Sequence, residues 1–163
     1  MQDPFQNLIH SLALQPHPEG GYFRETYRGA LQLTHLPGQG TRAVSTAILF
    51  LLPHGHISAL HRIKSDEVWH FYEGSPLCVV ELLPDGTRCD HRLGSASEGE
   101  QCQAVVRAGS WFGAYVDAPS GWSLVGCTVA PGFDFADFEM AERAALEAQY
   151  PQHRDVVRRL TRR

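Results

Sequence analysis

The sequence has little of what a membrane-spanning or zinc-binding protein needs. Its longest apolar run covers residues 47–52, far short of the ~20 residues with which a helix crosses a bilayer. The four cysteines include no CxxC pair, which argues against a zinc ribbon. The first residues carry neither the basic nor the apolar segment of a secretion signal. We therefore expect a cytoplasmic protein with reduced thiols and no membrane partner.

Positive charge is also scarce. The formal net charge is -4, and the one basic cluster lies near the end of the chain, at Arg154, Arg158, Arg159, Arg162 and Arg163. Such a cluster is either a nucleic-acid patch or the solvated end of a helix, and the acidic balance favours the second. We predict no nucleic-acid partner. With 163 residues, 43% of them hydrophobic, we expect a single domain over residues 1–163.

Short runs of strand-forming residues, separated by glycine, proline, aspartate or serine, fill the chain from Gly20 to Gly132. We expect nine strands, over residues 22–28, 44–52, 57–61, 67–73, 77–83, 87–93, 104–107, 111–116 and 122–130. This spacing predicts an all-β antiparallel sandwich or barrel over about residues 20–133. Strands and helices do not alternate, which argues against a parallel nucleotide-binding sheet.

Helical periodicity occurs only near the two ends. Phe5, Leu8, Ile9 and Leu12 recur at helical spacing and predict a short helix over residues 4–13. Residues 137–161 predict C-terminal helices, with Pro151 opening the second. Residues 29–42 are expected to form a mobile loop, because proline and glycine gather there.

The most informative stretch for function runs from Gly55 to Gly74. It holds His61, then Ile63, and Glu67 on the next predicted strand, so that His61 and Glu67 can face one another across a turn. One interpretation is a His–Glu pair that binds a metal or moves a proton. The other is a surface ion pair at a hairpin end, because charged residues lie alongside.

Aromatic residues accompany this pair. If Glu67 points inward, alternation also turns Trp69 and Phe71 inward, and a later strand adds Trp111 and Phe112. These four side chains can form the apolar wall of a ligand pocket or fill the core of a small barrel. Strict alternation allows only one of Trp111 and Phe112 to face the interior.

A third stretch, residues 16–28, combines a rigid turn with a strand that carries Tyr22 and Arg24. We expect Tyr22 and Arg24 to anchor a polar or anionic ligand. A buried arginine needs a partner. Arg24 therefore either grips such a ligand or pairs with Glu67 or Glu25 as a structural salt bridge.

These residues resemble the cupin superfamily. Its first motif, Gly-x5-His-x-His-x3,4-Glu-x6-Gly, matches at Gly55, His61, Glu67 and Gly74 and departs at Ile63. In its second motif, residues 107–109 stand in for Pro-x-Gly, and Phe112 stands where a histidine belongs.

More narrowly, residues 16–28, 65–72, 108–114 and 124–138 are similar to the uncharacterised cupin-like family catalogued as domain of unknown function 985. The resemblance covers nearly the whole chain. It implies a double-stranded β-helix, the jelly-roll cupin barrel, and a homodimer. It supplies no reaction, because the family has no assigned one.

The resemblance also bears on metal. Cupin oxygenases and oxalate enzymes usually hold their ion with three histidines and one glutamate, and two of those four positions are here Ile63 and Phe112. We expect no metal cofactor. Weak binding of a divalent ion at His61 and Glu67 stays an open alternative. Cupins without metal include sugar-nucleotide epimerases and storage proteins.

The leading hypothesis is a barrel that binds a small polar or anionic, sugar-like molecule. In it, His61 and Glu67 would move a proton without metal, in an isomerisation or epimerisation. Whether the protein is an enzyme at all stays open. One alternative is a non-catalytic binding or sensing module, which would follow if His61 pointed to bulk water. Another is a degenerate metal-dependent enzyme that uses His61, Glu67 and either His56 or a nearby polar residue.

Overall fold

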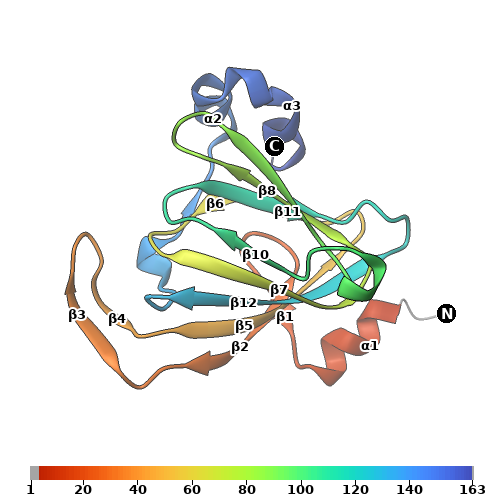
Figure 1. The fold of residues 1–163 in the computed structure, drawn as a ribbon, viewed down its shortest axis with the longest axis horizontal. Coiled ribbons are helices and arrows are strands. Elements are labelled where there is room, and N and C mark those ends of the chain that lie inside the picture. The colour runs from red at the N-terminus through yellow and green to blue at the C-terminus, as the bar shows by residue number, and fades with distance from the viewer. Residues whose placement is uncertain (1–3, 163) are drawn as a thin grey trace.

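The computed structural model describes residues 4–162, and two antiparallel sheets form its body (Figure 1). The six-stranded sheet has the order β1-β2-β5-β12-β7-β10, with bounds β1 Gln15–Pro16, β2 Tyr22–Arg28, β5 Thr46–Pro53, β12 Trp122–Ala130, β7 Asp66–Gly74 and β10 Gln103–Val106. The five-stranded sheet has the order β13-β6-β11-β8-β9, with bounds β13 Glu139–Met140, β6 Ile57–Arg62, β11 Trp111–Tyr115, β8 Leu77–Leu82 and β9 Arg88–Leu93. All nine strands predicted from the sequence are present, most within two residues of the expected bounds.

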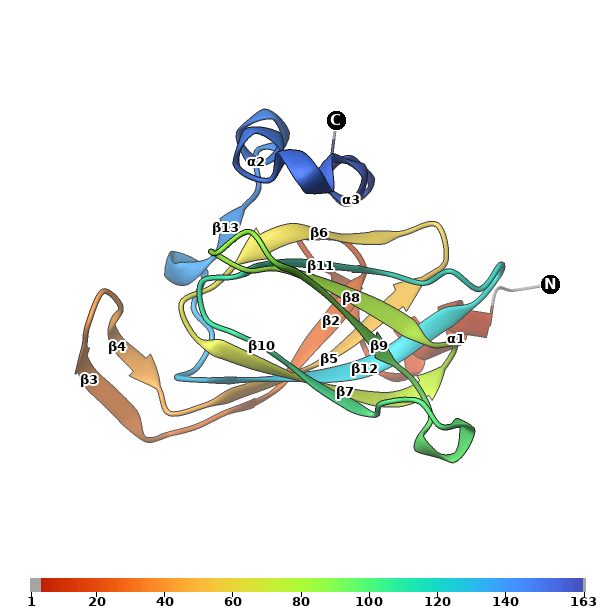
Figure 2. The same cartoon turned by 45° about the horizontal axis from the view of Figure 1, so that its top comes forward.

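The main core lies between the two sheets, which face each other in Figure 2. Side chains at alternate positions of each strand point into it; Phe50 and Trp69 come from the larger sheet and Phe112 and Val79 from the smaller. On β7 this alternation buries Glu67 and Trp69, while His70 turns to the outer face and hydrogen-bonds Thr128 at 3.1 Å. The arrangement confirms the predicted jelly roll.

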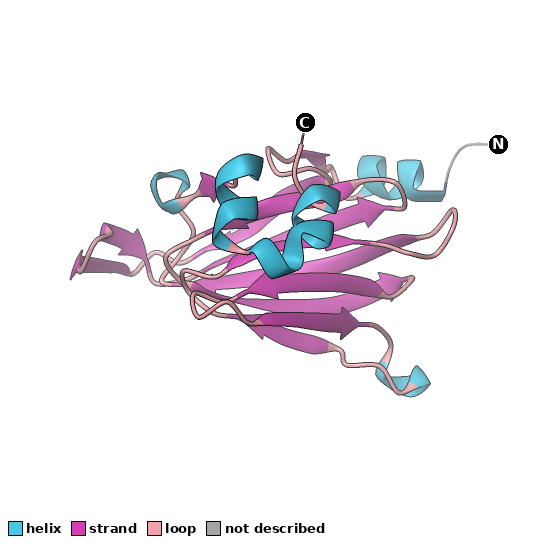
Figure 3. Cartoon of the chain, turned by 90° about the horizontal axis from the view of Figure 1, so that it is seen from above, coloured by secondary structure: helices cyan, strands magenta, loops and turns pink. Residues whose placement is uncertain are grey.

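A second core lies on the outer face of the smaller sheet. Helices α2 (Arg143–Gln149) and α3 (Arg154–Arg159) cover this face (Figure 3), and Leu146, Val157 and Leu160 pack against Leu60 and Trp111. The apolar contacts explain why the helices dock there.

The predicted C-terminal helical region begins too early. Residues 135–137 form a 3-10 turn and residues 139–140 form β13. Helix α2 starts only at Arg143, because the Glu142 carboxylate caps the backbone N–H groups of Ala144 and Ala145 at 3.2 and 2.8 Å.

Helix α1 (Pro4–Ser11) covers the outer face of the larger sheet, close to the predicted bounds. Its apolar residues Phe5, Leu8 and Ile9 pack near Leu51 and Leu124.

Residues 29–42, expected to be a loop, contain a hairpin instead. Strands β3 (Gln32–Leu36) and β4 (Gly40–Ala43) pair with each other and project from the body in Figure 1. The hairpin is tied down by Arg42, whose guanidinium donates to the buried Asp137 carboxylate at 2.8 and 2.9 Å. The Gln39 side-chain amide donates to the same carboxylate at 3.0 Å.

Candidate functional site

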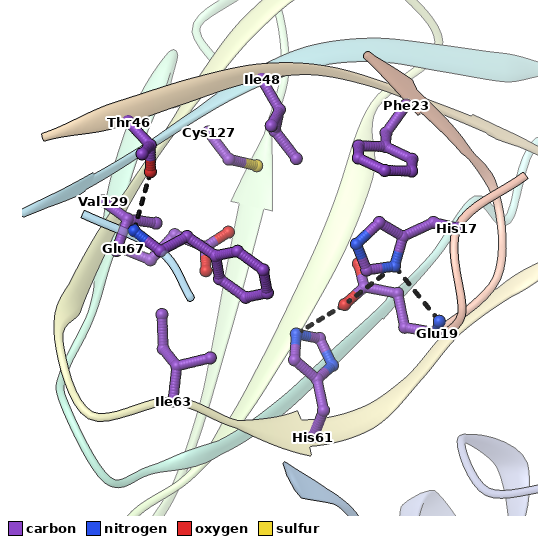
Figure 4. Close-up of a pocket in the computed structure, with 11 residues that line it drawn as sticks. His17, Glu19, Phe23, Thr46, Ile48, His61, Ile63, Glu67, Cys127 and Val129 are labelled. Atoms are coloured by element: carbon purple, nitrogen blue, oxygen red, sulfur yellow. Dashed lines mark hydrogen bonds and ion pairs between the residues drawn. The ribbon is translucent and has the colours of Figure 1, made fainter. Parts of the chain in front are cut away.

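A pocket opens between the two sheets (Figure 4). Its apolar wall consists of Phe23, Ile48, Ile63, Val129 and Phe133, and its polar groups are His17, Glu19, Thr46, His61, Glu67 and Cys127. Most of these residues come from neighbouring strands of the larger sheet. His61 lies on β6 of the smaller sheet, and Ile63 is the first residue after that strand ends.

The centre of the site is the pair formed by Glu19 and His61. The His61 Nε2 atom lies 2.8 Å from Glu19 Oε2, and the side chains are 4% and 8% exposed. In Figure 4 the two side chains point toward one another across the pocket floor. The chain can place Glu19 there because Gly20 and Gly21 adopt positive φ angles of 112° and 69°. A Cβ atom at Gly20 would collide with the carbonyl oxygen of Ile57.

The hydrogen bonds of His61 define its charge. Its Nδ1 lies 2.7 Å from the carbonyl oxygen of Ala59, and its Nε2 faces the Glu19 carboxylate, so both nitrogens act as donors to oxygen atoms. Burial alone would lower the pKa of His61, but the Glu19 carboxylate outweighs it and raises that pKa. Burial likewise opposes the charge on Glu19, but His61 holds its pKa below the ordinary value. Both shifts favour the form in which an imidazolium faces a carboxylate.

His17 lies on the other side of Glu19 and is neutral at neutral pH. Burial lowers its pKa, against the opposing effect of Glu19. The Nδ1 atom accepts a hydrogen bond from the backbone N–H of Glu19 at 3.2 Å, which leaves the ring hydrogen on Nε2. His17 is therefore a neutral hydrogen-bond donor in the pocket wall.

Glu67 is the second buried carboxyl group of the pocket. Burial, and then repulsion from Glu19, raises its pKa to about 7, although His61 acts in the opposite direction. Cys127 lies beside it, and burial together with Glu67 raises the pKa of the thiol well above its ordinary value. At neutral pH this part of the pocket therefore holds a carboxyl group that is close to half ionised and a thiol that keeps its proton.

The structure brings the predicted pair His61 and Glu67 into one pocket. It also places Phe112 in the core next to them, with its ring centroid 4.1 Å from that of His61. The surface-ion-pair interpretation of His61 and Glu67 is wrong, since both side chains are buried. Their catalytic role stays a prediction.

The expected inward orientation of Tyr22 and Arg24 is wrong. Alternation along β2 turns Phe23 into the pocket instead, so Tyr22 packs beneath α1 and Arg24 is exposed. The physical reason is that burying the phenylalanine is favourable, whereas burying the guanidinium would need a partner. Within residues 4–162, Glu25 pairs with Arg28 at 2.8 Å rather than with Arg24.

None of the four aromatic residues predicted to form the wall lines the pocket, and Phe112 lies in the core instead. Trp111 faces outward and packs under the C-terminal helices, with the Arg62 guanidinium 4.5 Å from its ring centroid. Trp69 is buried in the main core, where it packs against Phe50 and Phe112, and Phe71 is partly buried beside that core. Trp69 and Phe71 therefore match the core-packing interpretation.

Sequence reasoning missed His17 and Glu19. It gave His17 no role, because no ligand spacing surrounds it, and it treated residues 16–21 only as a rigid turn. A signal was present: a turn that is rich in proline and glycine and also holds a histidine and a glutamate presents polar side chains on a fixed backbone.

Comparison with known proteins settles the family. A family model described as Cupin superfamily (DUF985) matches residues 6–141. The chain belongs to this family. An uncharacterised protein of Saccharomyces cerevisiae, YML079W, is 31% identical over 147 residues, which cover 81% of this chain and 72% of the yeast protein.

Solved structures of similar cupins share the whole fold. A hypothetical protein from Leishmania major is 36% identical, with a TM-score of 0.90 over 97% of this chain and 98% of that one. Protein SO0799 from Shewanella oneidensis is 39% identical, with a TM-score of 0.86 over 99% of each chain. Oxalate decarboxylase from Bacillus subtilis is 15% identical, with a TM-score of 0.56 over 89% of this chain and 36% of that one, and shares the fold alone.

The donor set of this cupin does not fit the usual metal site. Ile63 lines the pocket with a hydrocarbon side chain, and Phe112 packs its ring on His61. Among residues 4–162, no three His, Cys, Asp or Glu side chains are arranged so that they could hold a metal ion. His56, the third ligand of the metalloenzyme alternative, lies exposed in the turn between β5 and β6 and outside the pocket lining.

No helix within residues 4–162 is long and apolar enough to cross a membrane. The cytoplasmic location and the homodimer stay predictions.

Proposed function

We propose that this cupin is a metal-independent enzyme of the isomerase or epimerase type, acting on a small, polar, sugar-like carbonyl compound in the pocket. The observation that carries the proposal is one buried pocket in which a charged His61–Glu19 pair stands beside a carboxyl group with a pKa of about 7.

Glu67 is the proposed proton carrier. A general acid or base works best when its pKa lies near the working pH, and Glu67 meets this condition because it is buried near Glu19. Its carboxylate would remove a proton from a carbon next to the carbonyl group. The electron pair of the broken C–H bond would form an enolate. The protonated Glu67 would then return the proton to the opposite face of the same carbon, after the enolate has turned over, or to the former carbonyl carbon, with the proton of the adjacent hydroxyl group passing to the enolate oxygen.

The histidines have different proposed roles. The Nε2–H group of the neutral His17 would donate to the developing enolate oxygen. His61 has both ring nitrogens bonded to oxygen atoms, so it would hold Glu19 ionised and in place. The charge on Glu19 in turn keeps the pKa of Glu67 high enough for the carboxyl group to take up a proton near neutral pH.

The charges of the pocket favour a neutral ligand over an anionic one. Among its eleven lining residues there is no lysine or arginine, and the one cationic group, His61, is already paired with Glu19. A ligand with hydroxyl and carbonyl groups can hydrogen-bond to carboxylates and imidazoles without needing a free cation.

The test is proton exchange in deuterated water. Purified protein is mixed with a panel of neutral ketoses and aldoses, and deuterium incorporation next to the carbonyl carbon is followed by NMR. Wild-type protein should exchange at least one panel member, and Glu67→Gln should slow the exchange ~10²-fold or more. The matched control is Glu81→Gln, which changes a buried glutamate outside the pocket and should keep the rate.

The result also separates the rival functions. Saturable binding without exchange would contradict the proposal and favour the binding module. Exchange that disappears after treatment with a chelator and returns with a divalent ion would favour the metal-dependent alternative. The inward, buried position of His61 argues against the form of the binding module in which this side chain points to bulk water.

A further inference from the structure

A second, larger chamber lies directly outside the pocket. Four residues line both spaces: Phe23, Thr46, Ile48 and Phe133. The two spaces are therefore neighbours that share these four side chains as a common wall. A ligand whose reacting group lies in the inner pocket would extend into the outer chamber as soon as it is larger than one ring.

The outer chamber combines an exposed aromatic ring with hydrogen-bonding groups. Phe135 is 55% exposed and meets Phe133 edge to face, with ring centroids 5.0 Å apart. Glu25, Arg28 and Asp134 complete the wall. The Arg28 Nε atom donates to Glu25 at 2.8 Å, and an Nη atom of the same guanidinium donates to the carbonyl oxygen of Phe133 at 3.2 Å, so its charge is already matched.

We propose that the outer chamber is a second binding subsite, which takes an uncharged, hydroxylated ring joined to the reacting group. This inference rests on the proposed function and extends it: the substrate would be a neutral two-ring compound such as a disaccharide. The apolar face of a sugar ring would cover Phe135, and its hydroxyl groups would bond to the carboxylates of Glu25 and Asp134.

The charge of the chamber argues against a phosphate or nucleotide extension. It holds two carboxylates and one guanidinium, and that guanidinium is bonded to one of the carboxylates. A phosphate would meet the carboxylates of Glu25 and Asp134 and no unpaired cation among the lining residues. A purely hydrocarbon extension would leave the carboxylates without water or partners.

The test is calorimetric titration of the whole chain with glucose, maltose, cellobiose and glucose 6-phosphate. At least one disaccharide should bind tighter than glucose by about fivefold or more, as expected for one added aromatic contact. Phe135→Ala should remove this advantage and leave glucose binding unchanged. The matched control is Tyr72→Ala, an aromatic ring of similar exposure, 56%, on β7 and outside both chambers, which should change neither.

Several results would overturn the proposal of a second subsite. These are no binding of either disaccharide, equal binding of disaccharides and glucose, tighter binding of glucose 6-phosphate than of any disaccharide, or retention of the disaccharide advantage in Phe135→Ala. The subsite and the reaction can fail separately. Proton exchange that depends on Glu67 but not on Phe135 would support the reaction and contradict the subsite. Binding that depends on Phe135, without any proton exchange, would support the subsite and contradict the reaction.

Discussion

The Glu19–His61 pair lies in the pocket, and the Glu81–His91 pair lies outside it. Glu19 bonds His61 at 2.8 Å between the sheets, and Glu81 bonds His91 at the same distance within the smaller sheet. Glu81 also accepts a hydrogen bond from the backbone N–H of Arg107 at 3.0 Å, and the His91 side chain is 16% exposed.

The two pairs have the same hydrogen-bond distance, but their surroundings differ. Beside Glu19 lies a second buried carboxyl group, Glu67, whose pKa is raised by burial and then by repulsion from Glu19, and both line the pocket. The Glu81 pair lines none of the described pockets, and its carboxylate already has a backbone donor. A site for acid–base chemistry therefore needs unbalanced charge beside free space, which a single satisfied ion pair does not supply.

The largest expected difference between the two pairs is in stability. His61→Ala should lower the free energy of unfolding by about 3–5 kcal/mol at pH 7, because it leaves Glu19 charged, buried and without its main partner. His91→Ala should cost about 1–2 kcal/mol, because Glu81 keeps the Arg107 donor. Urea unfolding followed by circular dichroism measures both values. Equal losses in the free energy of unfolding would mean that the two pairs contribute alike to stability.

The next effect concerns the pH dependence of stability. The pKa of Glu67 is about 7 in the folded protein and 4.5 for a free side chain, so the folded state binds more protons between these values. Wild-type stability should therefore fall as the pH rises from about 4.5 to 7. Glu67→Gln should be more stable than wild type by up to about 3 kcal/mol at pH 8 and equal to it near pH 4.

Urea titrations at these two pH values check this prediction. Glu81→Gln is the comparison, and it should show no such gain at pH 8. A Glu67→Gln variant that is destabilised equally at both values would mean that Glu67 is ionised and well bonded in the folded protein.

A smaller effect is the charge state of the two pocket histidines. The raised pKa of His61 means that its contribution to stability is complete below pH 6.5 and is lost as the pH rises through its folded value. His17 should stay neutral down to below pH 6.5, because its pKa is lowered. NMR titration of the ring carbons measures both, and Glu19→Gln should lower the pKa of His61. Titration of His61 below its free value in the wild type would contradict the ion pair.

The smallest expected effect is that of Arg24→Ala. Arg24 is exposed and lies outside the pocket, so the substitution should change stability by less than about 0.5 kcal/mol and leave saccharide affinity unchanged. Phe23→Ala removes the neighbouring residue that does line the pocket, and should weaken binding. Calorimetric titration with maltose compares the affinities of the two variants. A loss of maltose affinity in Arg24→Ala would mean that Arg24 belongs to the binding site.

The fold could be predicted because its signals are local. Strand runs, turn residues and the motif around His61 and Glu67 are each contained in short windows of sequence. The strand β2 shows the limit: whether Phe23 or its neighbours Tyr22 and Arg24 face inward depends on a register set by the turn at Gly20 and Gly21.

The polar half of the site could not be predicted for a similar reason. Glu19 meets His61 only because the turn after His17 is fixed to β6, where the backbone N–H of Ala59 donates to the carbonyl oxygen of Glu19 at 2.8 Å. The two residues lie far apart in the sequence, and no spacing rule connects them. The raised pKa of Glu67 is due first to its burial between the sheets and then to the charge of Glu19, and neither is readable from local spacing.

The bond between Arg42 and Asp137 has a practical consequence for anyone who redesigns this protein. Asp137 lies between Phe135 and Phe138, so a projecting hairpin that appears dispensable is in fact a brace for the rim through which ligands would enter. Shortening the hairpin, or fusing another protein to its tip, would loosen that rim from a distance.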